Sequence, residues 1–76
     1  MQKLLEILNN LHSDVDWVNE TALIDNGTLD SFDIIALVGD LNENFNVFVE
    51  LEHLEPDNFN TVDAMITLLK SLGADI

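Results

Sequence analysis

Apolar residues recur at three- and four-residue intervals in three stretches of the chain, the spacing of amphipathic helices. The stretches run from the first residues to about residue 12, from residue 30 to about residue 44, and from residue 62 to a stop at Gly73. The positions expected to face the core are Leu4, Leu5, Ile7, Leu8 and Leu11 in the first, Ile35, Val38, Leu41 and Phe45 with Leu37 beside them in the second, and Val62, Met65, Ile66, Leu69 and Leu72 in the third. This pattern predicts an all-α fold, a small helical bundle with three main helices.

The segments between these helices are predicted to be a long loop and an extended connection. Residues 13–29 are mostly polar, with isolated apolar anchors at Val15, Trp17, Val18, Leu23 and Ile24. A loop of this length in so short a chain is usually functional, and Trp17 is expected to cover the helix ends because large aromatic side chains dominate burial. Residues 46–51 alternate briefly, but a single short strand has no partner.

The last third of the chain carries signals for helix starts and stops. Pro56 suits the first position of a short helical turn that reaches about Phe59. Asn60 or Thr61 is expected to cap the final helix, and Gly73 to end it. Three helices and one short turn in 76 residues make one domain, which spans residues 1–76.

The net charge of the chain is strongly negative. Fifteen acidic residues face two basic ones, Lys3 and Lys70, for a formal net charge of -13. This surface repels nucleic acid and steers toward basic patches on other proteins, although acidity also keeps a small protein soluble. No stretch approaches the roughly 18–20 apolar residues of a membrane span, so we expect no membrane insertion and a cytoplasmic, monomeric protein.

Ser31 is the candidate functional residue. It follows Gly27-Thr28-Leu29-Asp30, where an acidic loop gives way to the second helix. Asp30 is a good N-cap, and Asp33 favours the positive end of the helix dipole. Ser31 then lies in the first turn, where free N–H groups tolerate a phosphate. The Asp-Ser pair alone fits a plain capping role equally well.

The order of the predicted elements, together with their acidity, resembles that of acyl carrier proteins of the phosphopantetheine-binding family. The segments that carry the resemblance are Leu29-Asp30-Ser31-Phe32-Asp33, similar to the family's Asp-Ser-Leu attachment motif, and Asn60-Thr61-Val62-Asp63-Ala64, similar to the start of its final helix. The likeness covers essentially the whole chain. It implies an acyl-carrier-like bundle in which Ser31 receives 4'-phosphopantetheine from coenzyme A.

The resemblance also implies partners and a cargo. A magnesium-dependent phosphopantetheinyl transferase would modify Ser31, and the thiol of the arm would hold an acyl or aminoacyl group as a thioester. An adenylating acyl or amino-acid ligase would load this cargo, and a downstream acyl or aminoacyl transferase would accept it. The chain has no Cys, so any thiol must come from such a group or from a partner. The protein would be a carrier and a substrate, not an enzyme.

Two features bear on the branch of the family and on partner recognition. Residues 57–61, Asp-Asn-Phe-Asn-Thr, resemble the Asp-Asp-Trp-Asn-Thr stretch of D-alanyl carrier proteins, which favours an aminoacyl type. Ala36 and Asn42 stand where the fatty-acid carriers often have acidic residues, so a different partner set is expected. The residues expected to contact partners are Asp30, Phe32, Asp33, Ile34, Asp40 and Glu43, with Phe32 and Ile34 offering exposed apolar surface. For Phe32, next to the helix start, a position in the core is the alternative.

Other chemistries fit the sequence less well. Catalysis by Ser31 needs a base, and neither His12 nor His53 is placed by the sequence to supply one. The acidic residues between Asp14 and Gly27 match no register of a calcium-binding EF-hand loop. We expect no metal site. The composition also allows a cargo-free acidic helical adaptor that binds a basic protein partner.

Overall fold

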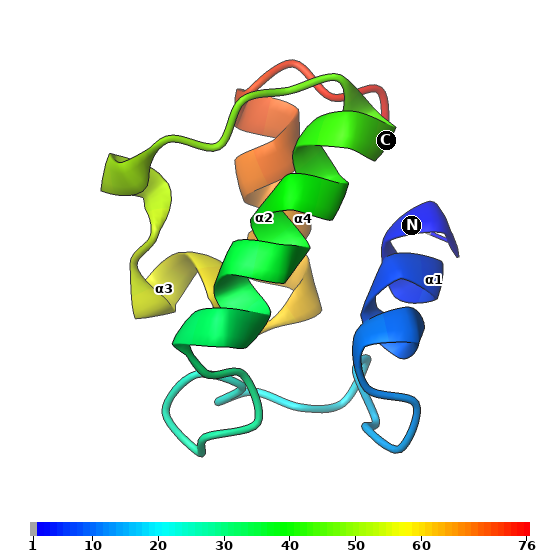
Figure 1. Cartoon of the computed structure of the whole chain (residues 1–76), viewed down its shortest axis with the longest axis vertical. Coiled ribbons are helices and arrows are strands. Elements are labelled where there is room, and N and C mark those ends of the chain that lie inside the picture. The colour runs from blue at the N-terminus through cyan, green and yellow to red at the C-terminus, as the bar shows by residue number, and fades with distance from the viewer. Residues whose placement is uncertain (1) are drawn as a thin grey trace.

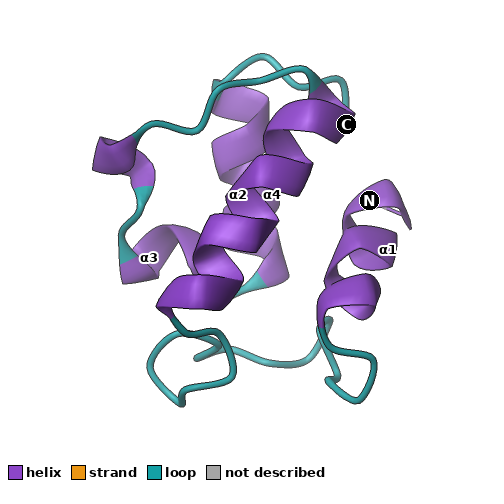
Figure 2. Cartoon of the chain, in the orientation of Figure 1, coloured by secondary structure: helices purple, strands orange, loops and turns teal. Residues whose placement is uncertain are grey.

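Helices make up all the regular structure in the computed structural model, which describes residues 2–76. In chain order they are α1 (Gln2–Leu11), α2 (Ser31–Phe45), the 3-10 turn η1 (Leu51–His53), α3 (Pro56–Phe59) and α4 (Val62–Ser71). Figure 2 shows helix and loop only over the described residues. The predicted all-α bundle of three main helices and a short turn is therefore confirmed, and η1 is an element that the sequence did not predict.

The long loop between α1 and α2 sets the arrangement of the bundle. In Figure 1, α1 runs down beside α2, which returns in the opposite direction, and α4 lies behind α2. The loop crosses one end of the molecule, and both labelled chain ends lie away from it. The start of α2 is consequently placed where the loop and α3 meet. None of the helices in residues 2–76 is long and apolar enough to cross a membrane.

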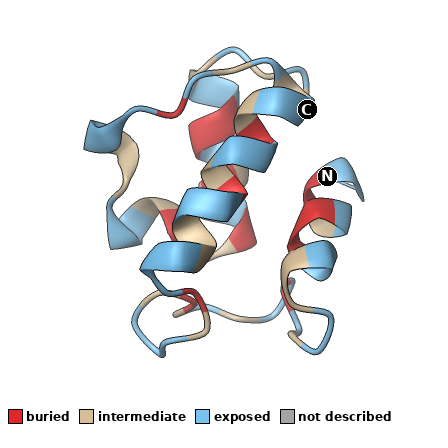
Figure 3. Cartoon of the chain, in the orientation of Figure 1, coloured by how far each residue is buried: buried red, intermediate tan, exposed pale blue. Residues whose placement is uncertain are grey.

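The core lies between α1, α2 and α4. Figure 3 shows buried positions on the side of α1 that faces α2. The completely buried side chains include Leu4 and Leu8 of α1, Leu37 and Leu41 of α2, and Met65 and Leu69 of α4. Helical positions four residues apart lie on one face, so each of these pairs presents one ridge to the core.

The buried face of α2 differs from the predicted stripe. Ile35 was expected inside but is 69% exposed, whereas Leu37, expected only beside the stripe, is completely buried. Ile34 and Phe45 are half-buried and pack against the core. The buried face therefore runs through Ile34, Leu37, Val38, Leu41 and Phe45, and Ile35 is the one position of the predicted stripe that lies outside it.

The loop over residues 13–29 is held by buried apolar anchors, as predicted. Trp17 is only 3% exposed, and its Nε1–H donates to the His12 carbonyl at 3.2 Å. Leu23 and Leu29 are also buried, and the Leu29 N–H donates to the Leu23 carbonyl at 2.9 Å. Val18 is an exception, since it is 62% exposed. Trp17 thus links the loop directly to the end of α1.

The ends of α4 follow the predicted signals, with one choice resolved. Thr61 is the N-cap, and its Oγ1 accepts from the Ala64 N–H at 2.9 Å. Gly73 has φ 95°, a conformation that glycine adopts without a steric cost. The Gly73 N–H donates to the Lys70 carbonyl, and the Ala74 N–H donates to the Leu69 carbonyl. These are the two bonds of a Schellman motif.

Candidate functional site

A capping box fixes the first turn of α2. The Asp33 N–H donates to Asp30 Oδ1 at 2.9 Å, and the Asp30 N–H donates to Asp33 Oδ2 at 3.2 Å. Each carboxylate thus satisfies a backbone donor of the other residue. Asp30 is the predicted N-cap, and Ser31 is the first residue of the helix, exposed to solvent. The hydroxyl therefore stands on a well-defined turn at the positive end of the helix dipole.

His12 joins this turn from the end of α1. Its Nε2 lies 3.0 Å from Asp33 Oδ2, and the side chains are 37% and 18% exposed. The hydrogen bond to Asp33 raises the pKa of His12 above its ordinary value, and partial burial opposes the change. The same bond lowers the pKa of Asp33, with burial again opposing. No local sequence pattern indicates this contact, because the two residues are 21 positions apart in the chain.

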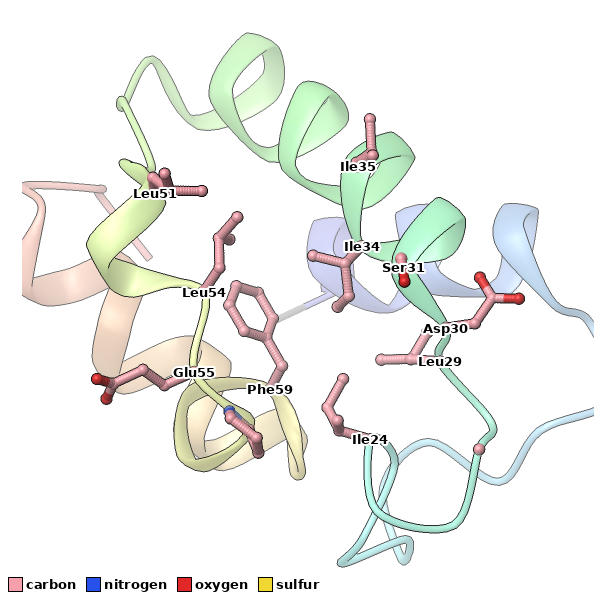
Figure 4. Close-up of a pocket in the computed structure, with 12 residues that line it drawn as sticks. Ile24, Leu29, Asp30, Ser31, Ile34, Ile35, Leu51, Leu54, Glu55 and Phe59 are labelled. Atoms are coloured by element: carbon pink, nitrogen blue, oxygen red, sulfur yellow. The ribbon is translucent and has the colours of Figure 1, made fainter.

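An apolar pocket of about 650 Å³ opens beside Ser31. Figure 4 shows Ile34 of α2, Leu54 after η1, Phe59 of α3 and Ile24 of the loop pointing toward a common space, with Ser31 at its margin. The polar side chains in the lining are Asp30, Ser31 and Glu55, and the others are Leu29, Ile35, Leu51 and Pro56, with Gly27. A group bound to a hydroxyl at this margin is within reach of the apolar side chains of the pocket.

The predicted apolar contact residues have different surroundings. Phe32 is 82% exposed, as expected. Ile34 is half-buried and lines the pocket, so the expectation that it offers exposed surface is wrong. Residue 34 precedes the buried Leu37 by about one helical turn, so its side chain lies on the buried side of α2, where Phe59 of α3 also lines the pocket. The exposed apolar side chains of α2 near Ser31 are instead Phe32 and Ile35, at 69%, and Leu51, at 85%, lies across the pocket (Figure 4).

The predicted acidic contact residues also divide into two groups. Asp30, Asp40 and Glu43 are exposed. Asp33 is half-buried, and its Oδ2 already accepts bonds from His12 and from the Asp30 N–H. The exposed surface of α2 and its N-cap therefore presents Asp30, Phe32 and Ile35 near Ser31 and the carboxylates of Asp40 and Glu43 farther along. We call these five residues, Asp30, Phe32, Ile35, Asp40 and Glu43, the α2 face.

The Ser31 hydroxyl makes no hydrogen bond to an imidazole or carboxylate within residues 2–76, where the His12 ring bonds to Asp33 instead. His53 lies in η1, where its Nδ1 accepts from the Glu50 N–H at 3.0 Å. Over the same residues no group of three or more His, Cys, Asp or Glu side chains has the arrangement of a metal site. Comparison of the chain with protein-family models, with curated proteins and with solved structures found no match.

Proposed function

We propose that this chain is a carrier protein whose Ser31 bears 4'-phosphopantetheine, with an acyl or aminoacyl group held as a thioester on the thiol of that arm. The observation that carries the proposal is the position of Ser31: an exposed hydroxyl on the capped first turn of α2, at the margin of an apolar pocket. The resemblance of residues 29–33 to the family's attachment motif supports the same residue.

The attachment step is a phosphoryl transfer on the Ser31 oxygen. This oxygen forms a bond to the phosphorus that carries pantetheine in coenzyme A, and the bond from that phosphorus to the nucleotide half breaks. The transferase removes the hydroxyl proton, because Ser31 has no bonded base of its own within the described residues. The resulting phosphodiester is an anion, which the free N–H groups and dipole at the start of α2 stabilise.

The pocket supports the second half of the proposal. An arm attached to Ser31 starts at the margin of an apolar space lined by Ile34, Leu54 and Phe59. Burying part of the arm or its cargo there removes apolar surface from water, at about 25 cal/mol per Å². The flexible tether also raises the effective concentration of cargo near a partner's active site.

The partners proposed are a phosphopantetheinyl transferase, an adenylating ligase and a downstream transferase. The α2 face would meet each of them, because it exposes Asp30, Phe32 and Ile35 near Ser31 and two carboxylates farther along the helix. Partners that read it need an apolar surface flanked by Lys or Arg, which also matches the net charge of -13. We place such a protein in the cytoplasm as a monomer.

The aminoacyl branch is a finer proposal that rests on residues 57–61. Three of these residues have roles in the fold: Phe59 is buried in the core, Asn60 bonds to the loop, and Thr61 caps α4. Loading of the modified protein by a panel of adenylating ligases tests the branch. Transfer of amino acids, and not of fatty acids, is the expected result, and fatty acids alone would contradict it.

Intact mass spectrometry tests the attachment itself. The protein is incubated with coenzyme A, magnesium and a broad-specificity phosphopantetheinyl transferase. Wild type is expected to gain one phosphopantetheine, and Ser31→Ala is expected to gain none. Ser13→Ala is the matched control, since Ser13 is an exposed loop serine and its loss should leave the gain unchanged. A wild-type protein that several such transferases leave unmodified would contradict the proposal.

The alternative is a cargo-free adaptor that binds a basic partner through the α2 face. The exposure of Phe32 and Ile35 favours it, because an apolar surface of this kind binds a protein without any covalent group. The two functions differ in their need for Ser31. If the protein is an adaptor, the wild type is not modified and Ser31→Ala keeps its affinity for the partner. If it is a carrier, Ser31→Ala loses the function.

A further inference from the structure

Asp33 Oδ2 is shared by two donors that come from different parts of the chain. It accepts from His12 at 3.0 Å and from the Asp30 N–H at 3.2 Å. The backbone of His12 is itself held in place. Its N–H donates to the Leu8 carbonyl at 3.0 Å, and its carbonyl accepts from the indole N–H of the buried Trp17. The imidazole therefore reaches the capping box of α2 from a fixed point at the end of α1.

We propose that His12 is a positioning residue for Ser31: by bonding to Asp33 it holds the first turn of α2 in place, and it does so more firmly when the imidazole is protonated. This inference rests on the proposed function, since it concerns the residue that would carry the arm. Asp33 links the two, because it bonds to His12 on one side and closes the capping box with Asp30 on the other.

The charges around the imidazole favour the protonated ring. Three carboxylates act on His12: Asp33 and Asp30 at the start of α2, and Asp14 in the loop that follows α1. All three raise the pKa of His12, the Asp33 hydrogen bond most, while partial burial lowers it. An ionised Asp33 only accepts hydrogen bonds, so Nε2 is the donor. A neutral ring with its proton on Nε2 keeps a weaker bond, and loss of the charge loosens the turn without releasing it.

Nuclear magnetic resonance of the unmodified protein tests the link without any partner enzyme. The His12 ring is expected to titrate with a midpoint above 6.5, and the amide signals of Ser31, Phe32 and Asp33 are expected to move with that midpoint. In His12→Gln these amides lose the transition, whereas His53→Gln keeps it. Amides that do not follow the His12 titration would overturn the proposal.

The rate of Ser31 modification tests the consequence. The ratio of the wild-type rate to the His12→Gln rate cancels the transferase's own pH dependence. This ratio is expected to fall about two- to fivefold as pH rises through the His12 midpoint, the range for a partly exposed ion pair. His12→Gln should also recover much of the rate lost in His12→Ala, because glutamine keeps a neutral donor.

The two proposals fail in different ways. If Ser31 of the wild type and of every variant stays unmodified, the carrier function is wrong, and the amide titration still tests the link between His12 and α2. If all are modified and the rate ratio stays constant with pH, the carrier function stands and the positioning role of His12 is overturned.

Discussion

The side-chain oxygen of Asn60 accepts a hydrogen bond from the Ile24 N–H at 2.9 Å and thereby ties the junction of α3 and α4 to the long loop. The same oxygen accepts from the Asp25 N–H at 3.2 Å, and the Asn60 carbonyl accepts from the Leu23 N–H at 3.0 Å. Ile24 is part of the pocket lining beside Ser31. One asparagine therefore holds a wall of the candidate site.

Asn60→Ala is expected to lower the free energy of unfolding by about 1–3 kcal/mol, because two backbone N–H groups lose their acceptor. Urea denaturation measures the loss. Asn9→Ala is the matched control: Asn9 is exposed on α1, so a change within about 0.5 kcal/mol is expected. Equal stability of the Asn60→Ala and Asn9→Ala proteins would show that the loop does not depend on this residue.

Two substitutions at Asp30 separate capping from recognition. Asparagine caps a helix as well as aspartate does, so Asp30→Asn should keep the free energy of unfolding. Asp30→Ala should lower it by about 1 kcal/mol, because the cap is lost. If basic partners read the charge of Asp30, both variants slow the modification of Ser31. A wild-type rate in Asp30→Asn would show that the charge is not read.

Phe32 and Phe48 form a matched pair of exposed aromatics, at 82% and 70%. Phe32 lies beside Ser31, and Phe48 lies in the connection after α2. Neither Phe32→Ala nor Phe48→Ala should change the unfolding free energy by more than about 0.5 kcal/mol. Only Phe32→Ala is expected to slow loading by a ligase, measured as the rate of thioester formation. Equal loading of the two variants argues against a role for the α2 face.

The His12–Asp33 pair gives stability a defined pH window. The raised pKa of His12 means that its contribution is complete below pH 6.5 and disappears as pH rises through the raised value. The lowered pKa of Asp33 means that its contribution is complete above pH 3.8 and disappears as pH falls through the lowered value. Wild type should therefore exceed His12→Gln most between pH 3.8 and 6.5.

The size of this difference is limited by solvent. Because the His12 side chain is 37% exposed, we expect no more than about 1 kcal/mol. Urea denaturation of both proteins across the pH range measures the difference. A difference that is constant with pH would mean that the charge of His12 does not contribute to stability.

Added sodium chloride or magnesium chloride should raise the melting temperature. The net charge of -13 makes the folded state repel itself, and salt screens that repulsion over a Debye length of about 10 Å at 0.1 M. Salt also weakens the His12–Asp33 pair, but one pair is a small term beside thirteen excess negative charges. Calorimetry at increasing salt measures the trend, and a melting temperature that stays constant or falls would contradict it.

The sequence by itself determined the three main helices, the short turn at Pro56 and the cap that precedes Ser31, whereas η1 was not predicted. Apolar residues at three- and four-residue intervals, the Asp30 N-cap and Gly73 act through contacts within a few residues. Their effect can therefore be predicted from the local sequence. The position of Ser31 at the first turn of α2 followed from the same local signals. The burial of Trp17 was also expected, because a large aromatic in a polar loop has few other ways to leave water.

Tertiary structure alone decided which side of α2 is buried and what surrounds Ser31. Ile35 and Leu37 are equally apolar, and only packing against other helices made one exposed and the other buried. His12 reaches Asp33 across 21 residues, and Asn60 reaches Ile24 across 36. Contacts over such separations depend on how the elements pack, which no local pattern encodes. For the same reason the pocket beside Ser31 exists only once the loop, α2 and α3 have come together.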